Sequence, residues 1–236
     1  MNTNTARWIL TALMVAGFYI LVQYITRTEE AFETGVSPTL VMLGDSILNN
    51  TAYVAHDESV EYLLRQKNSN SIVFLAQDNA CIGDVLQTQI PKIPTTTTTE
   101  THIFLSAGGN DILNAITGLT ISTEGIQRLF ETYKQLILAI QTNCPTSRLH
   151  LFNLYYPTSA LLKPYYKYID AWNHLLRNFV SQSNNALQEF PMAKLCFVDI
   201  DFVHVIEPSA ICSKKIVQSI LSSVTTYPSV TTSPSP

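Results

Sequence analysis

Short apolar runs alternate along this chain with longer amphipathic segments, and this alternation constrains its fold more than any other feature. The runs have the length of buried strands, whereas the longer segments repeat apolar residues at the spacing of one helical face. Strands that alternate with helices predict a parallel sheet with helices on both faces. The predicted strands are residues 40–43, 71–75, 102–106, 148–154 and 194–200, and the predicted helices are 59–66, 126–140, 165–179 and 209–224.

An uncharged apolar stretch near the N-terminus lies outside this pattern. Trp8 to Ile25 contains no charge and would be about 27 Å long as a helix, close to the ~30 Å hydrocarbon core of a membrane. The stretch exceeds the apolar core of a cleavable signal, and no small-x-small cleavage site follows it. We therefore expect a transmembrane signal anchor and linker at residues 1–35. A signal peptide that is removed, or a buried core helix, is the alternative.

The chain has three predicted parts: the anchor with its linker, a folded domain and a tail. Residues 36–224 form the expected domain, a three-layer α/β/α fold with a parallel, flavodoxin-like sheet. Residues 225–236 are rich in Thr, Ser and Pro and are expected to be a disordered tail. Arg7 precedes the apolar stretch and Arg27 with two glutamates follows it, which favours a cytoplasmic N-terminus and an exported domain. The domain would be secreted instead if the stretch were cleaved.

Composition excludes several classes of protein. Charged residues make up 14% of the chain, below the ~25% of average soluble proteins, and the net charge is -4. No basic cluster is present, so we expect no nucleic-acid partner. The sequence has no glycine-rich phosphate loop and no Cys-x-x-Cys metal spacing, so we expect no metal and no organic cofactor. Its four cysteines allow up to two disulfides, and three pairings are possible.

Polar residues follow several of the predicted strands where ligands bind in open α/β sheets, at the carboxyl ends. Ser46 follows the first strand in Gly-Asp-Ser, a turn that exposes a serine hydroxyl for nucleophilic attack. An Asp–Gly-rich loop with Gly83 follows the second strand, and Gly-Gly-Asn-Asp with Asn110 ends the third. Asp201 and His204 follow the fifth. A nucleophile, an amide and an acid–histidine pair are thus expected on one rim.

These segments, in this order, resemble the four blocks of the SGNH hydrolases, also called GDSL-type esterases and lipases. Residues 44–47 (Gly-Asp-Ser-Ile) are similar to the first block and residues 108–111 (Gly-Gly-Asn-Asp) to the third. Gly83 matches the second block loosely, and Asp201–His204 has the Asp-x-x-His spacing of the fourth. The resemblance spans residues 38–222.

The resemblance implies a role for each matching residue. Ser46 would be the nucleophile, His204 its general base and Asp201 the group that orients the imidazole. The Ser46 N–H, the Gly83 N–H and the Asn110 side-chain amide would form the oxyanion hole. For Asn110 the alternative is a turn that caps the following helix.

The fourth block departs from the family pattern, in which proline follows the histidine. Here the proline is Pro208, and Glu207 precedes it. Alignment on the proline would put Glu207 at the histidine position and His204 at the aspartate position. A third arrangement keeps His204 as base, oriented by Glu207 or Asp199. The ordinary pKa of glutamate, ~4.3, makes it a weak acceptor for a serine proton, so we take His204 as the working base.

The sequence therefore predicts a serine hydrolase of carboxylic esters that acts through an acyl-serine intermediate. Acyl esters, O-acetylated glycans and lipid esters are the substrates that the resemblance implies, and nothing in the sequence separates them. The domain would meet a membrane through residues 8–25. The alternative is a catalytically degenerate relative that binds a glycan or a protein at the same cleft, for which Glu207 is the only support.

Overall fold

The structure is a computed structural model, and it describes residues 38–67, 71–94, 100–183 and 186–225. The predicted anchor lies outside these residues, and so does the predicted tail except Thr225, which is the last residue of a helix. Five parallel strands form one sheet in the order β2-β1-β3-β4-β5, which is the flavodoxin-like order. The strands are β1 (Thr39–Gly44), β2 (Ser71–Phe74), β3 (Thr101–Ser106), β4 (Arg148–Phe152) and β5 (Leu187–Phe190).

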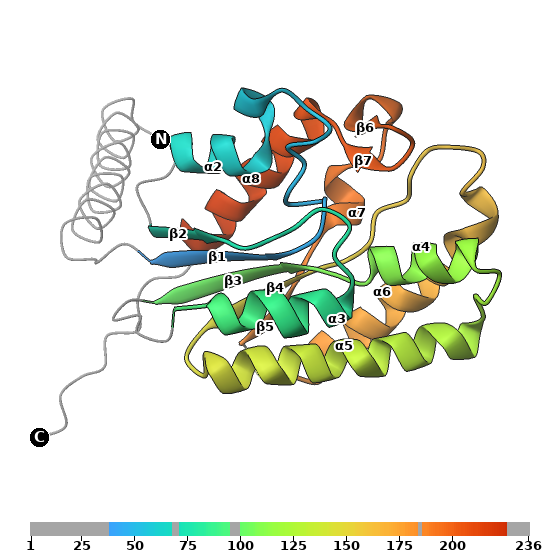
Figure 1. Cartoon of the computed structure of the whole chain (residues 1–236), viewed down its shortest axis with the longest axis horizontal. Helices are drawn as coiled ribbons and strands as arrows, with labels where there is room; N and C mark the ends of the chain where they lie inside the picture. Colours follow the sequence, from blue (N-terminus) through green and yellow to red (C-terminus); the bar gives the residue numbers. More distant parts are fainter. Residues whose placement is uncertain (1–37, 68–70, 95–99, 184–185, 226–236) are drawn as a thin grey trace, which may run out of the picture. The chain divides into compact units, whose positions relative to one another are not determined.

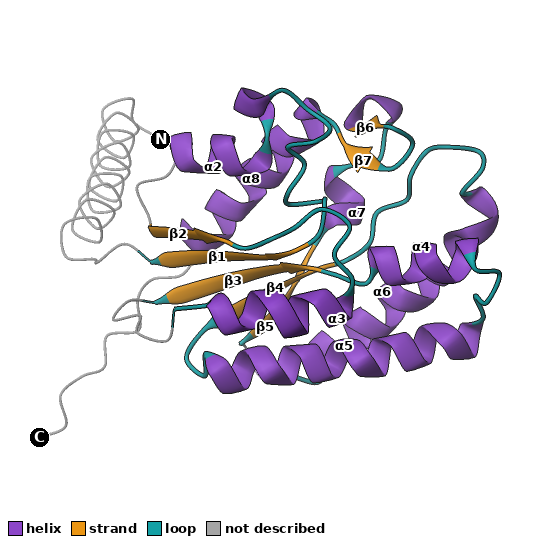
Figure 2. Cartoon of the chain, in the orientation of Figure 1, coloured by secondary structure: helices purple, strands orange, loops and turns teal. Residues whose placement is uncertain are grey.

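Helices cover both faces of this sheet, so the three-layer α/β/α prediction is confirmed (Figures 1 and 2). One face carries α2 and α8, and the other carries α3, α5 and α6. The helices are α2 (Val60–Lys67), α3 (Ile82–Asp84), α4 (Gly109–Thr117), α5 (Thr123–Asn143), α6 (Tyr166–Ser181), α7 (Met192–Leu195) and α8 (Ala210–Thr225). Short helical turns occur at His56–Glu58, Val85–Gln89, Ile90–Lys92, Lys163–Tyr165 and Asp199–Asp201. A small hairpin pairs β6 (Phe202–Val203) with β7 (Glu207–Pro208).

The alternating side chains of the strands build two separate cores. In β1, Val41 and Leu43 pack in the core beneath α5 and α6, whereas Leu40 and Met42 pack with α2 and α8. All four are fully buried, because a strand covered by helices on both faces has no solvent side. The helices supply matching apolar stripes; α5, for example, begins where the Ser122 hydroxyl accepts the Gly125 N–H.

The predicted fifth strand at residues 194–200 is wrong. The fifth strand is Leu187–Phe190, in which Leu187 and Phe190 are buried. The later segment folds instead into α7 and a helical turn, because the buried Asp201 carboxylate accepts the N–H groups of Phe197 and Val198. An apolar run that looked like a strand is thus bent around an acidic side chain.

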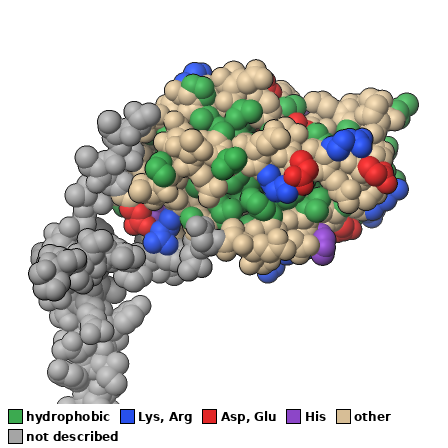
Figure 3. Space-filling view, turned by 90° about the horizontal axis from the view of Figure 1, so that it is seen from below, with side chains coloured by type: hydrophobic (Ala, Val, Ile, Leu, Met, Phe, Trp, Pro, Cys, Tyr) green, Lys and Arg blue, Asp and Glu red, His purple; other side chains and the backbone are tan. Residues whose placement is uncertain are grey.

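A disulfide joins Cys196 to Cys212 and so ties this bent segment to α8. Cys81 and Cys144 are free. In the part of the chain that the structure describes, no helix is both long and apolar enough to span a membrane. On the face seen in Figure 3, charged side chains are scattered among hydrophobic and uncharged polar ones, with no large patch of one sign.

A buried pair of histidines lies at the start of two neighbouring strands, away from the carboxyl rim. His102 Nδ1 and His150 Nε2 are 2.9 Å apart, and His150 stacks on Phe104. Glu100 and Arg148 lie at the outer end, with His102 Nε2 3.5 Å from the Glu100 carboxylate. Burial, together with the positive charges of His102 and Arg148, lowers the pKa of His150 to about 3; burial also lowers the pKa of His102.

We expect the histidine pair to make folding stability depend on pH. A histidine whose pKa is lower in the folded than in the unfolded chain takes up a proton on unfolding, so its contribution is complete above pH ~6.5 and is lost as pH falls. For His150 the loss between pH 7 and pH 5 is about 2 kcal/mol. Urea unfolding of the wild type and His150→Gln at both pH values measures it. The wild type should lose about 2 kcal/mol more than the variant, and equal losses would contradict the assignment.

Candidate active site

Ser46 lies in a tight turn directly after β1, as predicted. Gly44, the last residue of β1, has φ of +126°, a conformation that favours glycine. The buried Gln89 side chain holds Gly44 on both sides, accepting its N–H at 2.7 Å and donating to its carbonyl at 2.8 Å. The Asp45 carboxylate accepts the Ile47 N–H and thereby closes the turn over Ser46.

Asp45 anchors this turn to the neighbouring strand. Its Oδ1 accepts the Ser106 hydroxyl at 2.6 Å, and its N–H donates to the Ser106 carbonyl. The side chain is almost completely buried, and burial raises its pKa to about 7 despite the hydrogen bonds from Ser106 and Ile47. Sequence reasoning assigned no role to Asp45 or Gln89, although both fix the backbone that carries Ser46.

The two other predicted oxyanion segments are joined to each other. Asn110 is the second residue of α4, and its side-chain amide donates to the Ala80 carbonyl at 3.0 Å. The Asp111 carboxylate accepts the Ile82 N–H at 3.1 Å, at the start of the short helix α3 that contains Gly83. Gly83 is exposed there. These two bonds fix the loop after β2 against the first turn of α4.

Glu207 faces Ser46. It lies in β7 with only 8% of its surface exposed, and burial raises the pKa of its carboxyl group. The nearby Ser46 side chain lowers this pKa, the negative charge of Asp78 raises it and His204 lowers it. No group among the described residues bonds Glu207 Oε2. The structure thus brings together Ser46 and the residue that alignment on Pro208 puts at the histidine position.

His204 lies at the tip of the β6–β7 hairpin, where its side chain is exposed. Its φ is +46° and that of Val205 is +78°, so two non-glycine residues adopt left-handed conformations in succession. The ring lies 6.0 Å from that of Tyr53, whose hydroxyl donates to Asp78. His204 is therefore exposed to solvent, although it still lowers the pKa of Glu207.

Asp201 is not brought to His204. One of its oxygens accepts the Phe197 and Val198 amides, and the other accepts Lys215 Nζ at 2.6 Å. Burial raises the pKa of Asp201, but the bonds from Lys215 and the two amides together lower it. These bonds occupy both oxygens of the carboxylate and shape the turn before the hairpin. Asp199, the other predicted orienting residue, begins the same turn.

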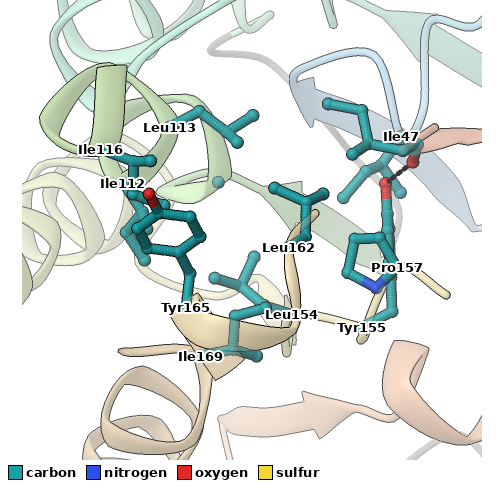
Figure 4. A pocket seen from close by; sticks show the side chains of 12 residues that line it. Ile47, Ile112, Leu113, Ile116, Leu154, Tyr155, Pro157, Leu162, Tyr165 and Ile169 are labelled. Carbon is teal, nitrogen blue, oxygen red and sulfur yellow. Dashed lines mark hydrogen bonds between the residues drawn. The ribbon is translucent and has the colours of Figure 1, made fainter. Parts of the chain in front are cut away.

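An apolar pocket of about 80 Å³ is lined in part by Ile47, the residue that follows Ser46 (Figure 4). Side chains of α4 form one side of it, and Ile47, Tyr155 and Pro157 form the opposite side. The α4 wall was missed because the helix is short and directly follows the Gly-Gly-Asn-Asp motif. The wall is Ile112, Leu113 and Ile116.

The fold and the rim together define a three-layer α/β protein with a buried serine at the carboxyl edge of a flavodoxin-like sheet. No protein-family model matches the sequence, and no curated protein sequence matches it. Solved structures do match across most of the chain. The predicted resemblance to GDSL-type lipases and esterases, the SGNH hydrolases, is thereby confirmed at the level of the fold.

Three of these structures illustrate the likeness. A member of the lipolytic G-D-S-L family from Veillonella parvula superposes with a TM-score of 0.65 at 15% identity, covering 81% of this chain and 100% of its own. Phospholipase A1 from Streptomyces albidoflavus gives 0.60 at 16% identity, covering 79% and 99%. A family 3 carbohydrate esterase from Clostridium thermocellum gives 0.56 at 18% identity, covering 79% and 94%.

Proposed function

We propose that this protein hydrolyses carboxylic esters, with Ser46 as the nucleophile and Glu207 as its base. The observation that carries the proposal is the buried Glu207 carboxyl group at the carboxyl edge of the sheet, close enough to the Ser46 side chain for the serine to lower its pKa. The names of the structural neighbours, which include a phospholipase and a carbohydrate esterase, support the same class of reaction.

Burial makes glutamate a better base than it is in water. An ordinary glutamate, with a pKa of about 4.3, accepts a serine proton poorly. Removal from water disfavours the charged carboxylate, so it holds a proton more strongly, and the nearby Asp78 charge acts in the same direction. The same changes that raise the pKa of Glu207 therefore increase its tendency to take the hydroxyl proton of Ser46.

The proposed reaction has two halves. Ser46 Oγ bonds to the carbonyl carbon as its proton passes to Glu207, and the Ser46 N–H, Gly83 N–H and Asn110 amide hold the oxyanion. The ester C–O bond then breaks, and Glu207 returns the proton to the departing alcohol. Water, deprotonated by Glu207, attacks the acyl-serine, releases the carboxylic acid and restores the hydroxyl of Ser46.

A Ser46–His204–Asp201 triad is the competing assignment within the same reaction. It would require Asp201, which Lys215 bonds at 2.6 Å, to approach the exposed His204 instead. We therefore assign the proton transfer to Glu207.

Our proposal for the location of the protein is the one that the sequence predicts. The domain is exported and held to the membrane by residues 8–25, or it is secreted if that stretch is removed.

Turnover of p-nitrophenyl butyrate by the full chain tests the proposed function. We expect release of p-nitrophenol, and we expect a fluorophosphonate to label the protein and abolish this release. A protein that unfolds cooperatively yet shows neither turnover nor labelling would overturn the proposal.

A second function, binding without catalysis, is favoured by one observation: Asp201 is bonded to Lys215 and His204 is exposed, so the usual Ser–His–Asp arrangement is not assembled. A glycan- or protein-binding domain with this fold would fail both the turnover and the labelling assays while remaining folded. Hydrolysis that depends on Ser46 would exclude it.

A further inference from the structure

The apolar pocket opens next to the polar residues of the site. Three of the residues that line it immediately precede or follow a proposed site residue in the chain, which puts the pocket beside the site. Its long walls come from α4 and from the segment between β4 and α6. These neighbouring pairs are Ile47 with Ser46, Gly109 with Asn110, and Ile206 with Glu207.

The pocket walls suit a hydrocarbon chain. Leu154, Leu162 and Ile169 face the aliphatic side chains of α4 across it (Figure 4). The Tyr155 hydroxyl, the polar group on the Ile47 side, already donates to the Ile206 carbonyl at 2.5 Å. A sugar hydroxyl placed against the aliphatic walls would lose its bonds to water, which is unfavourable, whereas a methylene group would gain from leaving water.

We propose that this pocket binds the acyl chain of the substrate, which makes the protein an esterase for medium-chain fatty-acyl esters. The inference rests on the proposed function, because the acyl carbon must sit at Ser46. Between Gly109 and Ile116 the helix advances about 10 Å, so the wall is long enough for an octanoyl chain. The chain would enter beside Asn110, while the leaving oxygen faces Glu207, which must protonate it.

A series of p-nitrophenyl esters tests the assignment. From acetate through butyrate and hexanoate to octanoate, kcat/KM should rise by about fourfold for each methylene group buried. Ile116→Trp fills the end of the pocket farthest along α4 from Gly109 and should remove the gain of octanoate over acetate. Leu138→Trp, on the exposed face of α5, is the matched control and should keep the full series.

Binding separates this inference from the proposed function. Ser46→Ala keeps the pocket but lacks the nucleophile, so calorimetric titration with octanoate should show binding that Ile116→Trp weakens at least about tenfold. Binding without turnover by the wild type would support the pocket and reject the esterase.

Two results would overturn the acyl assignment while leaving ester hydrolysis intact. One result is a kcat/KM that does not change along the acyl series, together with no detectable binding of octanoate. The other is a gain with octyl acetate but not with p-nitrophenyl octanoate, which would assign the pocket to the alcohol part of the ester.

Discussion

Ser46→Ala and Glu207→Gln are each expected to lower kcat/KM for p-nitrophenyl butyrate by about a thousandfold or more. The first removes the atom that bonds to the acyl carbon, and the second replaces the proton acceptor by an amide of the same shape. Because Glu207 is buried against Ser46, glutamine fits the same space and the fold should be retained. Initial rates, with circular dichroism to check folding, measure both effects.

His204→Gln is the matched control, since it makes the same kind of change to the other residue proposed as a base. His204 is exposed at the hairpin tip, so this variant should stay within about threefold of the wild type. The reverse pattern, with activity lost in His204→Gln and kept in Glu207→Gln, would contradict the account and restore the Asp-x-x-His assignment.

Gly44→Ala is expected to destabilise the fold by more than about 4 kcal/mol. A methyl group at this position would lie 1.7 Å from the Ser106 carbonyl oxygen and 2.6 Å from its carbon, and both atoms belong to the backbone of the adjacent strand. The positive φ of Gly44 adds conformational strain to this clash. Relief would require β1 and β3 to separate where the Ser46 turn begins. Urea unfolding, or recovery in the insoluble fraction, measures the effect.

Gly83→Ala supplies the stability control for this prediction. A methyl group at Gly83 meets no atom within 4 Å, and the residue lies in a short helix without a positive φ. Its free energy of unfolding should therefore change by less than about 0.5 kcal/mol. Equal destabilisation of the two variants would show that the close approach of β1 to β3 is not what excludes a side chain at residue 44.

The sheet could be predicted because its first four strands are apolar runs that both cores bury. The fifth was misplaced because Leu195 to Val198 has the composition of a strand, while Leu187 to Phe190 contains Gln and Glu. Composition alone does not show that the Asp201 carboxylate, which Lys215 bonds, will hold the Leu195–Val198 run in a turn. Tertiary contacts thus overrode local propensity.

The site was predictable where sequence position fixes geometry. Ser46 and Asn110 directly follow β1 and β3, so the parallel sheet brings them to one edge. The proposed base was not predictable, because the direction of the Glu207 and His204 side chains depends on a hairpin whose turn places two non-glycine residues at positive φ. Spacing favoured His204, while the hairpin turns Glu207 inward.

Rapid quenching of the wild-type protein during turnover of p-nitrophenyl butyrate, followed by peptide mass mapping, tests whether Ser46 is the nucleophile. We expect a butyryl group on Ser46 that forms with the first release of p-nitrophenol and is absent in Glu207→Gln quenched at the same time. Release of p-nitrophenol with Ser46 unmodified, or an acyl group on a different residue, would contradict it.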